Sequence, residues 1–341
     1  MKYKILGNTG LKVSTLCLGT MTFGGGKGMW RAIGELEQQE VDALIGKSVE
    51  AGINFIDTAN VYSEGISEQM TGKAIRNLGL HREDLVIATK VRGKMSENPN
   101  GSGLSRKHIL HQIDESLRRL NMDYIDLYQI HGYDELTPLE EIIDTMDTLV
   151  KSGKVRYIGC SNLTSWQVTK ANVYAHYNRL AKFVSLQAYY TIAGRDLERE
   201  IIPMLKDQHM GLMVWSPLAG GFLTGKFTRE AAIDGAARRV NFDFPPINKE
   251  KAYNIIDVLT PMALEKNCSV AQLALAWLLH NPTVSSIIIG AKKVDQLEDN
   301  LKSIDITFSE DELKKLDEVS KLSPEYPGWM LERQGADRKK V

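Results

Sequence analysis

Short runs of apolar and β-branched residues alternate with longer amphipathic stretches from about residue 15 to residue 302. This alternation is typical of β-α units repeated around a parallel sheet. The runs that we interpret as strands are 15–19, 53–57, 85–90, 124–130, 155–160, 183–187, 211–216 and 285–289. Eight parallel strands, each followed by a helix, can close on themselves, so the pattern predicts an α/β protein with a (β/α)8 TIM barrel. A doubly wound open sheet is the alternative, because strand order cannot be read from one sequence.

Three of the amphipathic stretches carry signals for where a helix begins or ends. The segment after Pro138 places its apolar residues on one helical face, and Ser152-Gly153 then supplies a C-terminal cap. Ser105 precedes a second helix, and Thr164 stands at the start of a third. Helices therefore follow the predicted strands, as the barrel requires.

The chain is longer than the roughly 250 residues that such a barrel typically needs. Turn residues at 7–10 predict an N-terminal hairpin that plugs the bottom of the barrel. A long loop follows the seventh strand, from Pro217 to about Pro246, and a tail of about residues 322–341 is expected near the active-site rim. No linker interrupts the alternation, so we expect residues 1–341 to form a single barrel domain.

Composition and charge restrict the partners of the chain. The 42 basic and 43 acidic residues leave a formal net charge of -1, which provides no excess for binding nucleic acid or an anionic membrane. Cys17, Cys160 and Cys268 lie far apart in apolar runs and suit free thiols in a reducing compartment. No apolar run approaches the roughly 18 residues of a membrane span, and no signal-peptide core is present. We expect a cytoplasmic protein with a small-molecule partner, and nothing in the sequence predicts an oligomeric state.

Polar side chains end three consecutive predicted strands, where the active sites of such barrels lie. Asp57 ends the second strand and Tyr62 follows closely, Lys90 ends the third strand, and His131 ends the fourth. Each residue taken singly has a structural interpretation, such as a helix cap, a solvated charge or a packed ring. Together at one rim, they indicate proton-transfer chemistry.

These four residue types suit the reduction of a carbonyl group. Hydride transfer to a carbonyl requires a proton for the developing alkoxide, and a tyrosine can supply it when its pKa, about 10 in water, is pulled toward neutrality. Lys90 would do this for Tyr62, and Asp57 would hold Lys90. His131 would orient the carbonyl oxygen or share the proton. The cluster therefore predicts a carbonyl reductase with Tyr62 as proton donor.

The residues around these positions resemble the aldo-keto reductase family. The stretch from Phe55 to Tyr62, continued by Gly65-Ile66-Ser67-Glu68, is similar to the signature of that family. Further matches follow in order at 89–90, 126–131, 159–162, 215–219 and 289–292, so the resemblance spans nearly the whole chain. It implies a barrel reductase of the short-loop bacterial type, also similar to potassium-channel beta subunits. Its catalytic tetrad would be Asp57, Tyr62, Lys90 and His131.

The sequence lacks the usual glycine-rich signals of nucleotide binding. No GxGxxG fingerprint follows the first predicted strand. The stretch from Gly220 to Phe227 comes close to a P-loop, but Phe227 stands where a P-loop needs Ser or Thr for magnesium. We therefore expect no nucleoside triphosphate, although a flexible loop with Lys226 can still contact a pyrophosphate.

The family resemblance instead implies NADPH/NADP+ as the cofactor. Ser161, Asn162 and Gln187 would hold its carboxamide, and the ring of Trp215, where many relatives carry Tyr, would stack on the nicotinamide. Lys292, near a predicted helix start, would meet the 2′-phosphate that distinguishes NADPH, with a solvated surface lysine as the alternative. The other residues expected to line the cofactor are Gly19, Thr20, Met21, Asp57, Ser216, Pro217, Leu218, Ala219, Gly221, Lys226, Gly290, Gln296 and Asn300.

Two other classes of protein are alternatives to an NADPH-dependent reductase. A nucleotide-binding regulatory or redox-sensing subunit with low turnover would be indicated by the loss of a tetrad residue or by an added partner-binding extension, and neither is visible. A metal-dependent barrel hydrolase would need His or carboxylate ligands ending several strands, and we expect no metal site because that pattern is missing. The aldehyde or ketone substrate is not identified further, because variable loops form the pocket walls of barrels.

Overall fold

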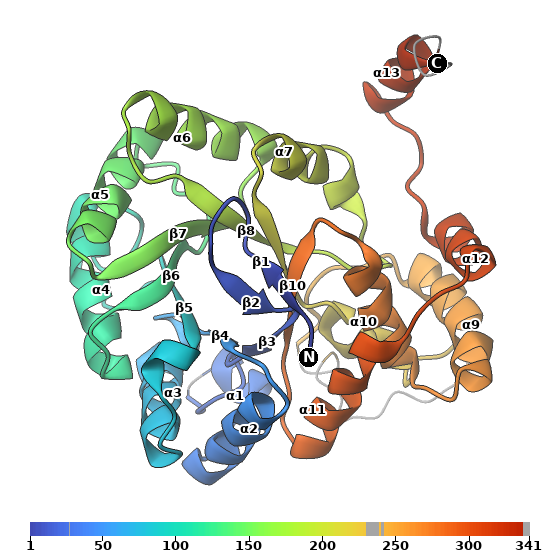
Figure 1. The fold of residues 1–341 in the computed structure, drawn as a ribbon, viewed down its shortest axis with the longest axis horizontal. Helices are drawn as coiled ribbons and strands as arrows, with labels where there is room; N and C mark the ends of the chain where they lie inside the picture. The colour runs from blue at the N-terminus through green and yellow to red at the C-terminus, as the bar shows by residue number, and fades with distance from the viewer. Residues whose placement is uncertain (27, 230–238, 240–241, 337–341) are drawn as a thin grey trace.

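Eight parallel strands close into one barrel (Figure 1), in the order β10-β3-β4-β5-β6-β7-β8-β9. The structure, a computed structural model, describes residues 1–26, 28–229, 239 and 242–336. The barrel strands are β3 (Leu16–Gly19), β4 (Phe55–Asp57), β5 (Val86–Val91), β6 (Ile125–Ile130), β7 (Val155–Ser161), β8 (Phe183–Tyr189), β9 (Gly211–Trp215) and β10 (Val284–Ile289). The closed order confirms the predicted barrel and excludes the open sheet. Every strand begins and ends within two residues of its predicted range.

Helices surround the barrel and cover its outer face (Figure 1). Those that follow the barrel strands are α2 (Gln38–Glu50), α3 (Ile66–Asn77), α4 (Arg106–Leu120), α5 (Leu139–Lys151), α6 (Ser165–Tyr177), α7 (Ile201–Asp207), α10 (Val270–His280) and α11 (Val294–Leu301). The predicted boundaries are confirmed, because Ser105 Oγ accepts a hydrogen bond from the His108 N–H at 3.3 Å and Thr164 forms a capping box with Gln167. α5 ends just before Ser152-Gly153.

The strands β5 and β6 are buried along their whole length. Their parallel register pairs Ala88 with Leu127 and Val91 with Ile130. Inward side chains fill the barrel and outward ones pack beneath the helices, so both faces of these strands are covered. Burial on both faces explains why the strands read as continuous apolar runs.

The N-terminal segment forms the predicted hairpin from the antiparallel strands β1 (Tyr3–Ile5) and β2 (Lys12–Ser14). Leu6 and Val13 pack against side chains of the barrel interior, including Phe55. Figure 1 shows the hairpin lying across the barrel opening that faces the viewer. The hairpin therefore closes the end of the barrel at which the strands begin.

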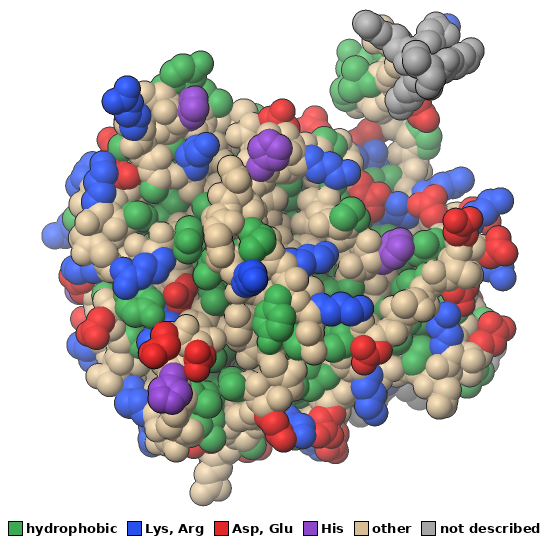
Figure 2. Space-filling view, in the orientation of Figure 1, with side chains coloured by type: hydrophobic (Ala, Val, Ile, Leu, Met, Phe, Trp, Pro, Cys, Tyr) green, Lys and Arg blue, Asp and Glu red, His purple; other side chains and the backbone are tan. Residues whose placement is uncertain are grey.

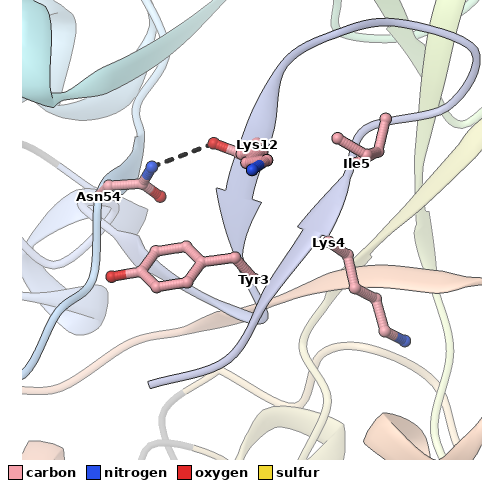
Figure 3. A pocket seen from close by; sticks show the side chains of 5 residues that line it. All are labelled: Tyr3, Lys4, Ile5, Lys12 and Asn54. Carbon is pink, nitrogen blue, oxygen red and sulfur yellow. Dashed lines mark hydrogen bonds between the residues drawn. The ribbon is translucent and has the colours of Figure 1, made fainter.

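The outer surface of the hairpin carries an open pocket of about 430 Å³ (Figure 3). Beside it, Asn54 Nδ2 donates a hydrogen bond to the Lys12 carbonyl at 3.0 Å. Figure 2 shows basic and acidic side chains interspersed over this face of the molecule. The pocket lies at the opposite end of the barrel from the predicted catalytic residues, so it is not the site that they predict.

Further segments extend the barrel, as the chain length requires. They include α1 (Met29–Ile33), the 3-10 helix η4 (Ala219–Thr224), α9 (Lys249–Glu265), α12 (Glu310–Ser320) and α13 (Gly328–Gly335). The part of the predicted long loop at 230–238 and 240–241 lies outside the described residues, as does the end of the tail at 337–341. Figure 1 shows α13 extending away from the barrel, and the approach of the tail to the active-site rim stays a prediction. Among the residues that the structure describes, no helix is long and apolar enough to cross a membrane.

Candidate active site

The four predicted catalytic residues come from neighbouring strands and meet at one rim of the barrel. Asp57 ends β4, Lys90 lies near the end of β5, and His131 directly follows β6. Lys90 Nζ donates hydrogen bonds to Asp57 Oδ2 at 2.5 Å and to Tyr62 Oη at 3.2 Å. The rings of Tyr62 and His131 pack edge to face, with their centroids 5.8 Å apart. All four side chains therefore form one cluster.

The connection after β4 determines where Tyr62 lies. The Asn60 N–H donates to a β5 carbonyl at 3.2 Å, so the chain continues alongside β5 beyond the end of β4. Tyr62 then opens the 3-10 turn η1 (Tyr62–Gly65), in which Ser63 and Glu64 adopt φ of 48° and 56°. Residues other than glycine rarely adopt this left-handed conformation, and such strain clusters at functional sites. The strained turn leaves the Tyr62 side chain 9% exposed.

Lys90 carries its charge inside the barrel because partners surround it. The side chain is completely buried, and burial alone would lower its pKa. Attraction by Asp57 and Tyr62 outweighs burial and raises the pKa of Lys90 above its ordinary value. Lys90 is therefore an ammonium group whose Nζ faces the tyrosine oxygen.

Two amides hold the second oxygen of Asp57. Gln187 Nε2 donates to Asp57 Oδ1 at 2.9 Å, and Gln129 Nε2 donates to the same atom at 3.1 Å. Gln129 is not among the predicted site residues. Its position in the sequence could have indicated this role. Gln129 lies on β6, two residues before His131, and residues two apart in a strand point to the same face. With Lys90 on the other oxygen, both oxygens of the Asp57 carboxylate are hydrogen-bonded.

His131 is neutral over the pH range in which enzymes work. Burial, together with the positive charges of Lys90 and Arg92, lowers its pKa to about 3. A neutral imidazole has one N–H donor and one acceptor nitrogen. His131 can therefore donate a hydrogen bond to a carbonyl oxygen without carrying a charge.

The residues predicted to hold a carboxamide lie beside this cluster. Ser161 Oγ and the Asn162 N–H donate to the Gln187 carbonyl at 2.9 and 3.1 Å. Asn162 Nδ2 donates to the His131 carbonyl at 3.2 Å, and the indole N–H of Trp215 donates to Asn162 Oδ1 at 3.0 Å. The ends of β7, β8 and β9 are thus linked to the tetrad by a continuous hydrogen-bond network.

Two aromatic rings lie against Trp215. The Tyr189 ring is tilted, with a centroid distance of 5.2 Å, and the Phe244 ring is parallel to within 7° at 5.9 Å. Phe244 therefore lies over part of the indole face on which a flat ring would stack. The sequence carries no signal for this contact, because Phe244 is far from Trp215 along the chain.

The loop after β9 follows a left-handed backbone path. Its residues Ser216, Ala219, Gly220 and Gly221 all adopt φ between 50° and 94°. Their N–H groups are used within the loop, because Ala219 donates to the Ser216 carbonyl at 2.9 Å, Gly220 to Ser216 Oγ at 2.9 Å and Gly221 to the Leu218 carbonyl at 3.0 Å. The predicted residues Pro217 and Leu218 belong to the same loop, and Lys226 is exposed at its end.

A buried cation holds this loop and is missing from the predicted set. Arg239 donates to the Ala219 carbonyl at 2.7 Å and to the Pro245 carbonyl at 2.8 Å, and it pairs with Asp243 at 2.7 Å. The hydrogen bonds join the two ends of the segment between β9 and α9. Nothing in its local sequence distinguishes Arg239 from a solvated arginine.

The residues predicted for the adenosine end surround the turn from β10 to α11. The Lys292 N–H donates to Gln296 Oε1 at 2.9 Å, and the Lys292 side chain is exposed. A Cβ at Gly290 would meet no atom within 4 Å, so there is open space above this glycine. Asn300 is 8% exposed at the far end of α11.

The predicted residues after β3 differ from one another in accessibility. Gly19 ends the strand, and Met21 is partly exposed. Thr20 is completely buried, and its hydroxyl lies 2.8 Å from Ser67 Oγ. The Thr20 hydroxyl therefore serves the contact between β3 and α3. The Thr20 backbone is also used within the protein, because its N–H donates to the Asp57 carbonyl at 3.0 Å and its carbonyl accepts from the Phe23 N–H at 3.0 Å.

An open pocket of about 530 Å³ adjoins the tetrad on the side of His131. Its lining consists of Arg92, His131, Gly132, Tyr133, Asp134, Glu135, Leu136 and Asn162. These residues follow β5, β6 and β7, so the pocket opens at the rim that carries the cluster. Within the described part of the chain, no group of three or more His, Cys, Asp or Glu residues is placed to hold a metal ion.

The closed barrel and the cluster at its rim are those of a barrel oxidoreductase. The model of the aldo/keto reductase family matches residues 15–321, and the chain belongs to this family. The family and the oxidoreductases among its relatives support the reduction of carbonyl groups.

The relatives of similar length include proteins named as oxidoreductases or reductases and proteins named as potassium channel subunits. The chain is 36% identical to an uncharacterized oxidoreductase, YrpG, of Bacillus subtilis, over 94% of this chain and 96% of that protein. It is 34% identical to versiconal hemiacetal acetate reductase of Aspergillus parasiticus, over 96% and 99% of the two chains. It is also 36% identical to a probable voltage-gated potassium channel subunit beta of Arabidopsis thaliana, over 96% and 99%.

Proposed function

We propose that the protein reduces aldehydes or ketones to alcohols, reversibly, with NADPH as the hydride donor and Tyr62 as the proton donor. The observation that carries this proposal is the buried ammonium of Lys90, 3.2 Å from Tyr62 Oη and fixed from behind by Asp57. A positive charge at that distance stabilises the tyrosinate that remains after the proton leaves. The cluster thus favours proton release from the Tyr62 hydroxyl.

His131, the remaining tetrad residue, has a complementary role in the reaction. A carbonyl oxygen that accepts a hydrogen bond from neutral His131 lies near Tyr62 Oη, because the two rings are packed against each other. As the oxygen becomes negative, His131 stabilises it by hydrogen bonding and Tyr62 protonates it. Asp57 holds Lys90 in place through their ion pair.

The residues at the rim fit a nicotinamide dinucleotide. When bound, this cofactor supplies the hydride. Asn162 and Ser161 offer amide and hydroxyl groups beside the tetrad, and Trp215 offers a flat ring once Phe244 leaves its face. The exposed side chains of Lys226 and Lys292 suit phosphate groups, including the 2′-phosphate of NADPH.

The experiment follows NADPH oxidation with a reactive aldehyde, comparing the wild type with Tyr62→Phe. We expect Tyr62→Phe to lose roughly 10²- to 10⁴-fold in turnover, the usual contribution of general acid catalysis. NADPH binding, measured by quenching of tryptophan fluorescence, stays unchanged. Tyr128→Phe is the matched control, because the Tyr128 hydroxyl is buried away from the rim and has no hydrogen-bond partner among the residues that the structure describes. Full activity of Tyr62→Phe would show that another group donates the proton.

A regulatory, nucleotide-binding role with low turnover is the second candidate. The similarity to channel beta subunits favours it. It predicts tight NADPH binding without oxidation by any aldehyde or ketone in a broad panel. The same assay therefore separates the two roles, and NADH measured in parallel tests the preference for NADPH.

A further inference from the structure

The open pocket beside His131 contains a cation that the tetrad does not use. Arg92 directly follows β5, two residues after Lys90, and its side chain is exposed to the pocket. Among the described residues, its guanidinium makes one hydrogen bond and no ion pair within 4.0 Å. The Asp134 carboxylate interacts with it electrostatically, since Arg92 helps to lower the pKa of that carboxyl, but the two form no ion pair. An arginine without a direct ion-pair partner beside a reaction site is suited to bind an anionic group.

The backbone of Arg92 is strained into place. Its φ is +143°, in a region that side-chain-bearing residues seldom adopt. The Gly103 N–H donates to the Arg92 carbonyl at 2.9 Å, which ties this conformation to the loop that follows. Strain of this kind persists where the surrounding structure imposes it, commonly at ligand clamps. In this conformation the side chain reaches the loop after β6, at the Tyr133 carbonyl.

The side chain of Arg92 is held by one nitrogen and open at the other two. Its Nε donates to the Tyr133 carbonyl at 2.8 Å. Its stem passes over Gly132, where an added Cβ would lie 3.5 Å from Arg92 Cδ and 3.6 Å from Nε. The two terminal amino groups have no hydrogen-bond partner among the described residues. They form a fork with the geometry that binds both oxygens of a carboxylate or phosphate.

Asp134, an acidic residue of the pocket lining, directs its hydrogen bonds to groups other than this fork. Asp134 Oδ2 accepts hydrogen bonds from the Leu104 N–H at 2.7 Å and from Thr137 Oγ1 at 2.8 Å, and Asp134 Oδ1 accepts one from the Leu136 N–H at 3.1 Å. These bonds commit Asp134 to the loops that form the wall. Glu135 is the other acidic residue of the lining, and its side chain is exposed to solvent.

We propose that Arg92 binds an anionic oxo group of the substrate, so that the preferred substrates are aldehydes or ketones bearing a carboxylate or phosphate at their other end. This inference rests on the proposed reductase function of the same site. Arg92 and His131 line one pocket, so a substrate held by its anion at Arg92 presents its carbonyl to His131 and Tyr62. Arg92 is then a specificity-determining residue.

The test uses a matched pair of aldehydes, 4-formylbenzoate and its methyl ester, which differ in one charge. The ratio of their kcat/KM values is compared between the wild type and Arg92→Gln, because intrinsic reactivity cancels in that comparison. Glutamine and lysine both carry a Cβ, so Arg92→Gln and Arg92→Lys keep the same backbone strain. Lys94→Gln is the control, since it removes one positive charge from the same loop, where Lys94 pairs with Glu97 at 2.6 Å.

We expect Arg92→Gln to lose roughly 10- to 100-fold in kcat/KM for the carboxylate, mostly through KM, the usual value of a charge-assisted hydrogen-bonded pair. Activity on the ester stays within about twofold, and Lys94→Gln keeps the wild-type ratio. Arg92→Lys recovers part of the loss, because it keeps the charge and loses the fork. Equal losses on acid and ester, or an unchanged ratio, would overturn the proposal. Repeating the series with 4-formylphenyl phosphate decides which anion is preferred.

A binding measurement separates this proposal from the reductase function. Titration calorimetry with terephthalate, which has no aldehyde, reports the anion site without turnover. If no aldehyde is reduced but Arg92→Gln abolishes terephthalate binding, the anion site stands and the reductase proposal fails. If aldehydes are reduced and terephthalate binds wild type and Arg92→Gln equally, the anion site fails alone.

Discussion

Two buried ion pairs lie on opposite sides of β5. Two consecutive residues of that strand contact them, Lys90 on one side and Thr89 on the other. On the inner side, Lys90 pairs with Asp57 at 2.5 Å. On the outer side, Arg119 pairs with Glu68 at 2.6 Å, and Thr89 Oγ1 donates to the other oxygen of Glu68 at 2.6 Å. Both pairs are almost completely excluded from solvent. Burial and charge pairing alone therefore do not distinguish a structural site from a chemical one.

The difference lies in what else each cation touches. The outer pair joins α3 to α4 and to the barrel wall. Gly65, at the end of the turn that begins with Tyr62, adopts φ +94°, and an added Cβ there would lie 2.7 Å from Arg119 Cδ. The outer pair thus supports the turn from behind, whereas Lys90 faces a tyrosine hydroxyl beside an open pocket. A buried charge becomes chemically useful where it meets a group that can release a proton.

Removing the cation of either ion pair, Lys90 or Arg119, should have the largest effect on the comparison. Lys90→Met and Arg119→Met each leave a buried carboxylate unpaired, which costs about 3–5 kcal/mol of unfolding free energy. Lys90→Met additionally loses at least roughly a hundredfold in turnover, because Tyr62 loses its stabilising charge. Arg119→Met keeps its turnover per folded molecule within a few-fold. Urea unfolding and NADPH oxidation on the same preparations check both, and an equal loss of turnover would erase the distinction.

Removing one neutral donor from each carboxylate should have a smaller effect. Thr89→Val takes a hydroxyl from Glu68, and Gln129→Leu takes an amide from Asp57, each at about 1–3 kcal/mol of unfolding free energy. Only Gln129→Leu should lower kcat, because only Asp57 positions Lys90. A fall in kcat for Thr89→Val larger than for Gln129→Leu would contradict this assignment.

The pH dependence of His131 tests the inner side of β5 without removing a partner from either ion pair. Its pKa is about 3 in the folded protein and 6.5 ordinarily, so the unfolded chain binds a proton that the folded protein does not bind between these values. The stability that His131 contributes is therefore present above pH 6.5 and is lost as the pH falls toward 3. Unfolding measured across this range should show a smaller loss in His131→Asn. A step in kcat/KM near pH 6.5 that vanishes in His131→Asn would mean that the folded residue titrates normally.

The fold could be predicted from the sequence because strands that are buried on both faces consist mainly of apolar residues. β5 and β6 are covered on both faces, so they read as apolar runs, and the caps at Ser105 and Thr164 are local signals. The tetrad was accessible for a related reason. Parallel strands in a barrel end at one rim, so a polar residue ending each of several strands must lie near the others.

What the sequence did not reveal depends on backbone paths and distant contacts. The left-handed φ of Arg92 has no local signal, because that conformation is imposed by Gly103 and the loop around it. The contact between Phe244 and Trp215 depends on how a long loop returns to the barrel. Gln129 lies in the predicted β6 run, but an amide in an apolar strand can be satisfied in many ways, and its bond to Asp57 appears only once the barrel is closed.

The N-terminal hairpin makes the two ends of the barrel unequal. Leu6 and Val13 pack against side chains of the interior at the end where the strands begin. The interior itself is filled by side chains, so the hairpin adds to a packed core. The hairpin end therefore contributes to stability, and the chemistry that we propose is confined to the opposite rim, which carries Tyr62.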